Sequence, residues 1–240
     1  MKTMPRTGAL PLTNADHRLA PLKDLQPGEL RLHELYRSLQ GESIYAGLPC
    51  VFVRTTACNL RCSWCDTPHA FNQGTKIPRA DVLAKVLSLD TPLVELTGGE
   101  PLLQPDVFPL MVDLCDAGKT VLLETSGSLP IAAVDRRVHI ILDLKCPDSG
   151  ESEANLWANL DDLKPTDEVK FVVASGRDWL WAVDAVKTHR LDDRFTVQIS
   201  AAFGELDLKD LAEWVLQSGR NVRLQLQAHK FIWDPKARGV

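Results

Sequence analysis

Three cysteines, Cys58, Cys62 and Cys65, stand in a C-x3-C-x2-C arrangement within one short stretch of the chain. The stretch follows an apolar run, Val51 to Thr56, that has the composition of a strand. Thiolates are the usual protein ligands of iron–sulfur clusters. Three thiolates from one loop can bind three irons of a 4Fe-4S cluster and leave the fourth iron open to an outside ligand. The spacing therefore predicts a site-differentiated 4Fe-4S cluster.

Two other uses of these thiols stay open at this point. A structural zinc ion would need a fourth protein ligand, and His69 is the only candidate nearby, since Cys115 and Cys146 stand apart. A disulfide among the three would leave one thiol over, and we expect no secretory signal in this sequence. The cluster is the interpretation that uses all three thiols and needs no fourth protein ligand.

Other residues could bind ligands beside a cluster. The run Gly98-Gly99-Glu100-Pro101 would let a ligand approach the backbone closely, although the same run also suits a turn. Arg54 could pair with a substrate carboxylate through its planar guanidinium group, or it could be a surface cation. Asp66 and Thr67 could make a turn through their side-chain oxygens, or offer a hydroxyl oxygen to Mg²⁺.

Two further sites each have two interpretations. The run Gln40-Gly41-Glu42 is either a polar turn or an amide and a carboxylate that meet the edge of a heterocycle. His229 is either a structural histidine or a ligand-binding one.

Alternating strand-like and helix-like segments would position these residues. The predicted strands cover Leu30–Tyr36, Val51–Thr56, Leu93–Thr97, Thr120–Thr125, His139–Leu144, Glu168–Ala174, Phe195–Ser200 and Val222–Gln227. The predicted helices cover Arg79–Ser88, Pro105–Ala117, Glu153–Leu160, Trp179–His189 and Leu208–Gln217, with Asp178 and Asp207 as N-caps and Gly118 and Gly219 as stops. The alternation predicts a parallel sheet with right-handed crossovers, closed into a barrel or a partial barrel.

The candidate residues directly follow the predicted strands. Active sites of such sheets lie at the carboxyl ends of the strands. The cysteine loop, the Gly-Gly-Glu-Pro run, the end of the third strand at Glu124 to Gly127 and the end of the fourth at Asp143 to Lys145 all obey this rule. We therefore expect them to meet at one edge of the sheet.

Length and composition limit the class of protein. The chain has 240 residues, enough for one large α/β domain, and we expect a flexible arm over residues 1–27 and a single domain over residues 28–240. A net charge of −5 argues against a nucleic-acid-binding protein. We expect no membrane span, because no run of about 18 apolar residues occurs. Six cysteines without a pairing framework favour the cytoplasm.

The cluster motif, the Gly-Gly-Glu-Pro run and the polar strand ends together resemble the radical S-adenosylmethionine (SAM) superfamily. Within it, the chain resembles the 7-carboxy-7-deazaguanine synthase family in the segments Tyr36 to Glu42, Phe52 to Arg54, Cys58 to Thr67, Glu168 to Phe171 and Leu224 to Lys230. This resemblance implies a modified, incomplete parallel (β/α) barrel of the β6/α3 type, usually in a homodimer.

The resemblance also implies a reaction. The enzyme would be a lyase that converts 6-carboxy-5,6,7,8-tetrahydropterin to 7-carboxy-7-deazaguanine with loss of ammonia, a step toward queuosine and other 7-deazapurines. The implied cofactors are a 4Fe-4S cluster, SAM and Mg²⁺. A flavodoxin-like or ferredoxin-like reductant would supply an electron, and the 5′-deoxyadenosyl radical formed from SAM would take and later return a hydrogen of the pterin.

The resemblance also assigns roles to individual residues at the positions that match the family's motifs. The resemblance implies that Cys58, Cys62 and Cys65 bind the cluster and that Thr67 binds Mg²⁺. The implied SAM contacts are Trp64, Asp66, Gly99, Glu100, Ser126, Asp143, Leu144, Lys145 and Gln198. The implied pterin contacts are Leu39, Gln40, Gly41, Glu42, Arg54, Thr97, His229 and the C-terminal Val240. No catalytic residue is assigned beyond the cofactors.

Two competing functions stay open on the sequence alone. An activase that makes a glycyl radical on a partner protein would share the cluster and the Gly-Gly-Glu run, but it would not need Arg54 or the Leu39 to Glu42 segment. An electron carrier or a zinc-stabilised binding module would need a fourth protein ligand and would not cleave SAM.

Overall fold

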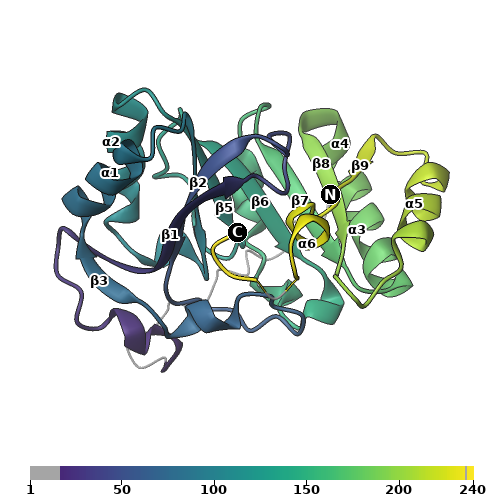
Figure 1. Cartoon of the computed structure of the whole chain (residues 1–240). Helices are drawn as coiled ribbons and strands as arrows, with labels where there is room; N and C mark the ends of the chain where they lie inside the picture. The colour runs from purple at the N-terminus through teal and green to yellow at the C-terminus, as the bar shows by residue number, and fades with distance from the viewer. Residues whose placement is uncertain (1–16, 236) are drawn as a thin grey trace.

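The computed structural model describes residues 17–235 and 237–240. Its centre is a nine-stranded sheet in the order β3-β1-β2-β4-β5-β6-β7-β8-β9 (Figure 1). The strands are β1 (Glu29–Leu39), β2 (Pro49–Thr55), β3 (Thr75–Pro78), β4 (Leu93–Gly98), β5 (Thr120–Thr125), β6 (His139–Lys145), β7 (Glu168–Val173), β8 (Thr196–Ala201) and β9 (Val222–Leu224). Strands β2 and β4 to β9 pair in parallel, and β1 pairs antiparallel with both β2 and β3. Because β3 and β9 are separate edges, the barrel is incomplete, as predicted.

Helices connect most of the parallel strands. They are α1 (Arg79–Ser88), α2 (Val107–Asp116), α3 (Gly176–His189), α4 (Leu191–Arg194), α5 (Leu208–Gln217) and α6 (His229–Ile232). Figure 1 shows α1 and α2 together at one end of the sheet and α3, α4 and α5 at the other. The predicted helices Arg79–Ser88 and Leu208–Gln217 are confirmed at both ends.

The helix ends follow their local chemistry. Asp207 caps α5 by accepting a hydrogen bond from the Lys209 amide at 2.8 Å, as predicted. The prediction for Asp178 is wrong, because Ser175 caps α3 by accepting from the Asp178 amide. Gly118 and Gly219 follow α2 and α5 with φ of 76° and 61°, a left-handed conformation that suits glycine at a helix end.

The predicted helix Glu153–Leu160 is wrong, since short 3-10 turns occupy this segment. Two buried asparagines explain the difference. Asn155 accepts from the Lys145 amide and donates to the Lys145 carbonyl, each at 2.9 Å. Asn159 donates to the carbonyls of Gly127 and Leu129. Such side-chain bonds to the backbone compete with helix formation and instead tie this loop to the ends of β5 and β6.

The strands place alternate residues on opposite faces of the sheet. On β6, Ile140, Leu142 and Leu144 belong to the main core under the helices. On the other face of β6, Ile141 belongs to a small cluster with Cys50, Phe52, Leu93 and Leu122, while Asp143 lines a cavity. This period of two puts charged side chains inside the curved sheet without placing them in the core.

The N-terminal segment contacts the cysteine loop. Residues His17–Leu22 form a 3-10 helix, and Arg18 Nη1 donates to the Asn59 carbonyl at 2.6 Å. The rest of the predicted arm, residues 1–16, lies outside the described residues, and the domain boundary at residue 28 stays a prediction. Within the described part of the chain, no helix has the length and apolar character to cross a membrane.

Candidate active site

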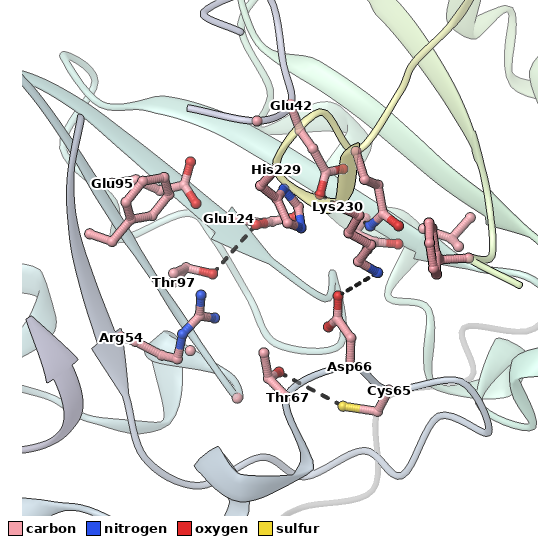
Figure 2. Close-up of a pocket in the computed structure, with 18 of the residues that line it drawn as sticks. Glu42, Arg54, Cys65, Asp66, Thr67, Glu95, Thr97, Glu124, His229 and Lys230 are labelled. Atoms are coloured by element: carbon pink, nitrogen blue, oxygen red, sulfur yellow. Dashed lines mark hydrogen bonds and ion pairs between the residues drawn. The ribbon is translucent and has the colours of Figure 1, made fainter. Parts of the chain in front are cut away.

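One cavity of about 260 Å³ collects most of the predicted site residues (Figure 2). It lies among the carboxyl ends of the parallel strands, the β1 end and the C-terminal segment. All three cysteines of the motif line it. The other predicted residues in its wall are Leu39, Gln40, Gly41, Glu42, Arg54, Trp64, Asp66, Thr67, Thr97, Gly99, Ser126, Asp143, Lys145, His229 and Val240.

The cysteine loop is held in place by hydrogen bonds to neighbouring loops. The Ser63 amide donates to the Ser149 carbonyl at 3.1 Å, and Asn59 donates to Ser128 Oγ at 2.9 Å. Burial raises the pKa of Cys58 to about 12 and raises the pKa of Cys62. Iron must therefore displace protons from these thiols when it binds.

The thiols are spread too widely for a single zinc ion. Within the described residues, the only group of three histidine, cysteine or acidic residues with ligand atoms all within 4.8 Å of one another is His33, Glu34 and His69. A tetrahedral zinc with Zn–S bonds of 2.3 Å would hold sulfur atoms about 3.8 Å apart. His69, the possible fourth zinc ligand, instead lies 3.9 Å from Glu34. The donor set therefore fits a larger, thiolate-bound cluster.

The two glycines after β4 allow that strand end to pack against the cysteine loop. Gly98 has φ of 151°, and a Cβ there would lie 2.4 Å from Thr55 Oγ1. A Cβ on Gly99 would lie 2.2 Å from the Ala57 carbonyl oxygen. The Glu100 amide donates to that same carbonyl at 2.8 Å. The main role of the two glycines is therefore to let the ends of β2 and β4 pack closely. Exposure of the backbone to a ligand is a secondary role.

Glu100 works behind the cavity wall. Its buried carboxylate accepts from Thr125 Oγ1 at 2.9 Å, from Ser126 Oγ at 2.6 Å and from the Leu102 amide at 3.0 Å. Burial raises its pKa despite these bonds. Glu100 therefore orients Ser126, which does line the cavity.

A lysine joins three acidic side chains on the inner face of the sheet. Lys170 Nζ lies 2.6 Å from Glu124, 2.7 Å from Glu42 and 4.0 Å from Asp143. Burial alone would lower the pKa of Lys170, but the three carboxylates outweigh burial and raise it. Asp143 also pairs with Lys145 at 2.9 Å. These ion pairs stabilise charged lysine and acidic side chains in the buried wall of the cavity.

Glu95 differs from the three carboxylates around Lys170 because Lys170, although near enough to lower its pKa, forms no ion pair with it within the described part of the chain. Burial and the nearby Glu124 raise its pKa well above the ordinary value. Gln40 donates its side-chain amide to the Glu95 carboxyl group. Thr97, two residues along β4, lies 3.4 Å from Glu124. The inner face therefore presents Glu95, whose pKa is raised, next to Glu124, whose pKa Lys170 lowers despite burial.

Arg54 enters the cavity from β2. It stands beside Thr97 in the strand register, and its Nη2 donates to the Tyr36 hydroxyl at 3.3 Å. Figure 2 shows its guanidinium group pointing towards Thr97 inside the cavity, with Thr67 nearby. The guanidinium thus faces the interior of the cavity.

The C-terminal segment closes one side of the cavity. The Ala228 amide donates to the Gly41 carbonyl at 3.0 Å, and a Cβ on Gly41 would lie 2.4 Å from His229 Nδ1. Lys230 pairs with Asp66 in the cysteine loop at 2.9 Å (Figure 2). Glycine is required at position 41 because the His229 ring packs directly on it.

Three predicted SAM contacts do not line the cavity. Glu100 lies behind the wall, and Leu144 points into the main core because it alternates with Asp143 and Lys145. Gln198 is buried and donates to Glu168, which also pairs with His139 at 2.8 Å. Side chains alternate along a strand, so Asp143 and Lys145 face the cavity while Leu144 between them faces the main core.

Among the cavity residues that were not predicted as site residues, four carry charges in the networks described above: Glu95, Glu124, Lys170 and Lys230. A signal for three of them was available. Each is a charged residue in an otherwise apolar strand, at a position that faces the same side of the sheet as Arg54 or Asp143. A buried charge in a strand indicates function more often than packing. Lys230 had no such signal, because it lies on the short α6.

Comparison with known proteins gives a consistent result. Residues 52–149 match the family model of the radical SAM superfamily. The 7-carboxy-7-deazaguanine synthase of Koribacter versatilis is 46% identical over 88% of this chain and 100% of its own length. The enzyme of the same name from Chlorobaculum tepidum is 45% identical over 88% of this chain and 97% of its own. The crystal structure of QueE from Escherichia coli has the same fold, with a TM-score of 0.70 and 22% identity over 84% of this chain and 95% of that one.

Proposed function

Since this chain belongs to the 7-carboxy-7-deazaguanine synthases of the radical SAM superfamily, we propose that the cavity lined by the three cysteines holds the cluster, SAM and 6-carboxy-5,6,7,8-tetrahydropterin side by side. The observation that carries the proposal is that the three cysteines and Arg54 line the same cavity. A thiolate-bound cofactor and a carboxylate-binding group in one cavity suit a substrate that bears a carboxylate. The glycyl-radical activase would not need this pairing.

Cys58, Cys62 and Cys65 would hold the cluster, which supplies one-electron reduction of SAM when it is bound. Trp64, Asp66, Gly99, Ser126, Asp143 and Lys145 would surround SAM. The Asp143–Lys145 pair presents charges of both signs, which suits an amino acid moiety. The contacts of the cysteine loop with Ser128 and Ser149 would hold the cysteines in position.

The pterin would occupy the inner face of the sheet. Arg54 would pair with its carboxylate through two parallel hydrogen bonds. Gln40, Glu42 and Glu124 would meet the ring edge, where the pterin N–H groups need acceptors. His229, neutral because burial lowers its pKa, would cover the ring from the C-terminal side. Together these contacts would hold the pterin ring in one orientation.

Thr67 would bind Mg²⁺ together with the substrate. Its hydroxyl lies in the cavity 3.8 Å from Cys65 Sγ, and Figure 2 places it between Arg54 and the cysteine loop. Magnesium prefers oxygen ligands and keeps several waters, so one protein hydroxyl and a substrate carboxylate are an adequate set. The ion would then share the carboxylate with Arg54.

The partners follow from the same proposal. An external flavodoxin-like or ferredoxin-like protein would supply electrons, and the enzyme would work in the cytoplasm as a homodimer. We propose no nucleic-acid partner, in keeping with the net charge of −5.

The test is an anaerobic assay with reconstituted enzyme, a chemical reductant, SAM, Mg²⁺ and the carboxypterin. Formation of 7-carboxy-7-deazaguanine supports the proposal. Formation of 5′-deoxyadenosine without that product would contradict it and favour the activase. Cys65→Ala should abolish the product, while Cys115→Ala, outside the cavity, should leave it unchanged.

A further inference from the structure

A second group of metal-ligand side chains lies beside the proposed active site. His33 Nε2 is 2.9 Å from Glu34 Oε1, and His69 Nε2 is 3.9 Å from the same oxygen. The three side chains are only 8%, 17% and 15% exposed. We propose that His33, Glu34 and His69 bind a divalent transition-metal ion such as Zn²⁺, separate from the cluster and from Mg²⁺.

A bulge in β1 brings the two adjacent residues together. Leu32 pairs with Thr55 and Glu34 with Arg54, so His33 is an extra residue without a partner in β2. Neighbouring side chains in a regular strand point to opposite faces. A bulge interrupts this alternation and re-aims a side chain. The bulge therefore lets His33 and Glu34 both face His69.

In its neutral form, His33 would present a lone pair to a carboxylate. His33 Nδ1 lies 3.0 Å from the Gln73 carbonyl oxygen, which accepts only, so Nδ1 carries the hydrogen. In the neutral ring, Nε2 is then an acceptor that faces another acceptor, Glu34 Oε1, at 2.9 Å. A cation between them resolves this conflict. A carbonyl on the far nitrogen is also the usual support for a metal-binding histidine.

The ligand types determine which metal would bind. Two imidazoles and one carboxylate suit zinc or ferrous iron, whereas Mg²⁺ prefers oxygen ligands. Glu34 and His69 line the cavity, so the open coordination positions would face it. Arg54, opposite Glu34 in the strand register, and Arg238, whose charge acts on His69, are nearby positive charges that would limit the affinity.

A bound metal would connect two parts of the active site. His69 lies in the 3-10 helix Pro68–Phe71, directly after Thr67, while His33 and Glu34 lie on β1. The ion would fix the segment that follows Cys65 and Thr67 against the sheet. It would thus act on the position of the loop and not on the redox chemistry.

The experiment uses the cluster-loaded enzyme, so that Cys58, Cys62 and Cys65 are not free to bind zinc. Equilibrium dialysis against Zn²⁺ alone, followed by metal analysis, should find one zinc per chain in addition to the cluster iron. His33→Gln and His69→Gln should each weaken zinc binding by at least about tenfold, a typical effect of losing part of a metal's ligand environment. His189→Gln, which replaces a histidine stacked on Trp157 far along the chain, is the matched control and should bind zinc like the wild type.

Two results would overturn the site. One is wild-type zinc binding in both variants at unchanged iron content. The other is no zinc bound by the wild type, in which case a shared proton joins His33 and Glu34. Co²⁺ absorption gives a second readout, because a nitrogen and oxygen site lacks the thiolate-to-metal charge-transfer bands of a cysteine site. Iron content and product formation are measured separately, so failure of this site leaves the proposed function untouched.

Discussion

A Cβ atom on Gly99 would lie 2.8 Å from the Cβ atom of Cys58. The end of β4 therefore packs directly on the first cysteine of the motif, and the Glu100–Ala57 hydrogen bond fixes this contact. The glycine run and the cysteine motif, which are far apart in the sequence, are two halves of one packed unit. This relationship makes cluster binding sensitive to a residue that binds no iron.

Gly99→Ala should lower the iron content of the reconstituted enzyme several-fold, because the new methyl group must displace Cys58 or the Ala57 carbonyl. Iron and sulfide analysis measures this. Gly176→Ala is the matched control, since a Cβ there meets its nearest atom at 3.9 Å, an ordinary contact. Equal iron content in the two variants would contradict the packing argument.

Arg54→Ala should weaken binding of the carboxypterin and leave the cluster intact. Loss of a charge-assisted pair costs about 1.5–3 kcal/mol, which corresponds to a rise in KM of about tenfold to a hundredfold. Steady-state kinetics and iron content together test this. Arg54→Lys should recover only part of the loss, because an ammonium group cannot form the two parallel bonds. An unchanged KM in Arg54→Ala would remove the assignment.

Thr67→Ala should raise the Mg²⁺ concentration needed for half-maximal activity, because the ion loses its protein ligand. Thr67→Ser keeps the hydroxyl and is the matched control. Activity measured across a Mg²⁺ series after chelator treatment gives the answer. If Thr67→Ala and Thr67→Ser respond alike to Mg²⁺, Thr67 is not a ligand.

Glu95 should make the folded state less stable as the pH rises. Its pKa is raised in the folded protein above the ordinary 4.5, so the folded state holds a proton that the unfolded chain has lost. The stabilising effect is complete below pH 4.5 and is lost as the pH rises through the folded-state pKa. Glu95→Gln keeps an acceptor for Gln40 and cannot ionise, so its stability relative to the wild type should increase with pH over this window.

Urea unfolding of both proteins at a series of pH values measures that difference. Glu205→Gln, an exposed change, is the control and should follow the wild type at every pH. A constant difference between Glu95→Gln and the wild type over this range would show that Glu95 keeps an ordinary pKa.

Much of this fold was predictable from local patterns. The parallel strands and the helices α1 and α5 follow from apolar runs, helical periodicity and the Asp207 cap. The segment Glu153–Leu160 was not predictable in the same way. Its asparagines bond to Gly127, Leu129 and Lys145, and these tertiary partners outweigh the local helical pattern. The short β3 was missed because four residues carry too little pattern.

Residues that belong to a sequence motif could be assigned to the site from the sequence. Residues whose role depends on which face of the sheet their side chain occupies could not. The cysteines, Arg54 and Thr67 meet in one cavity as expected. Leu144 and Gln198 do not line that cavity, because a sequence run does not state which face of the sheet each residue occupies. The His33–Glu34–His69 group could not be predicted, because it depends on a bulge that only the pairing of β1 with β2 reveals.

The central claim is that Cys58, Cys62 and Cys65 hold a cluster with one iron left open for SAM. Electron paramagnetic resonance of the reduced, anaerobically reconstituted enzyme, recorded with and without SAM, tests it most directly. We predict a 4Fe-4S signal whose g-values shift when SAM is added, and loss of the signal in each cysteine variant. A signal that SAM leaves unchanged, or a cluster that survives replacement of any of the three cysteines, would contradict the account.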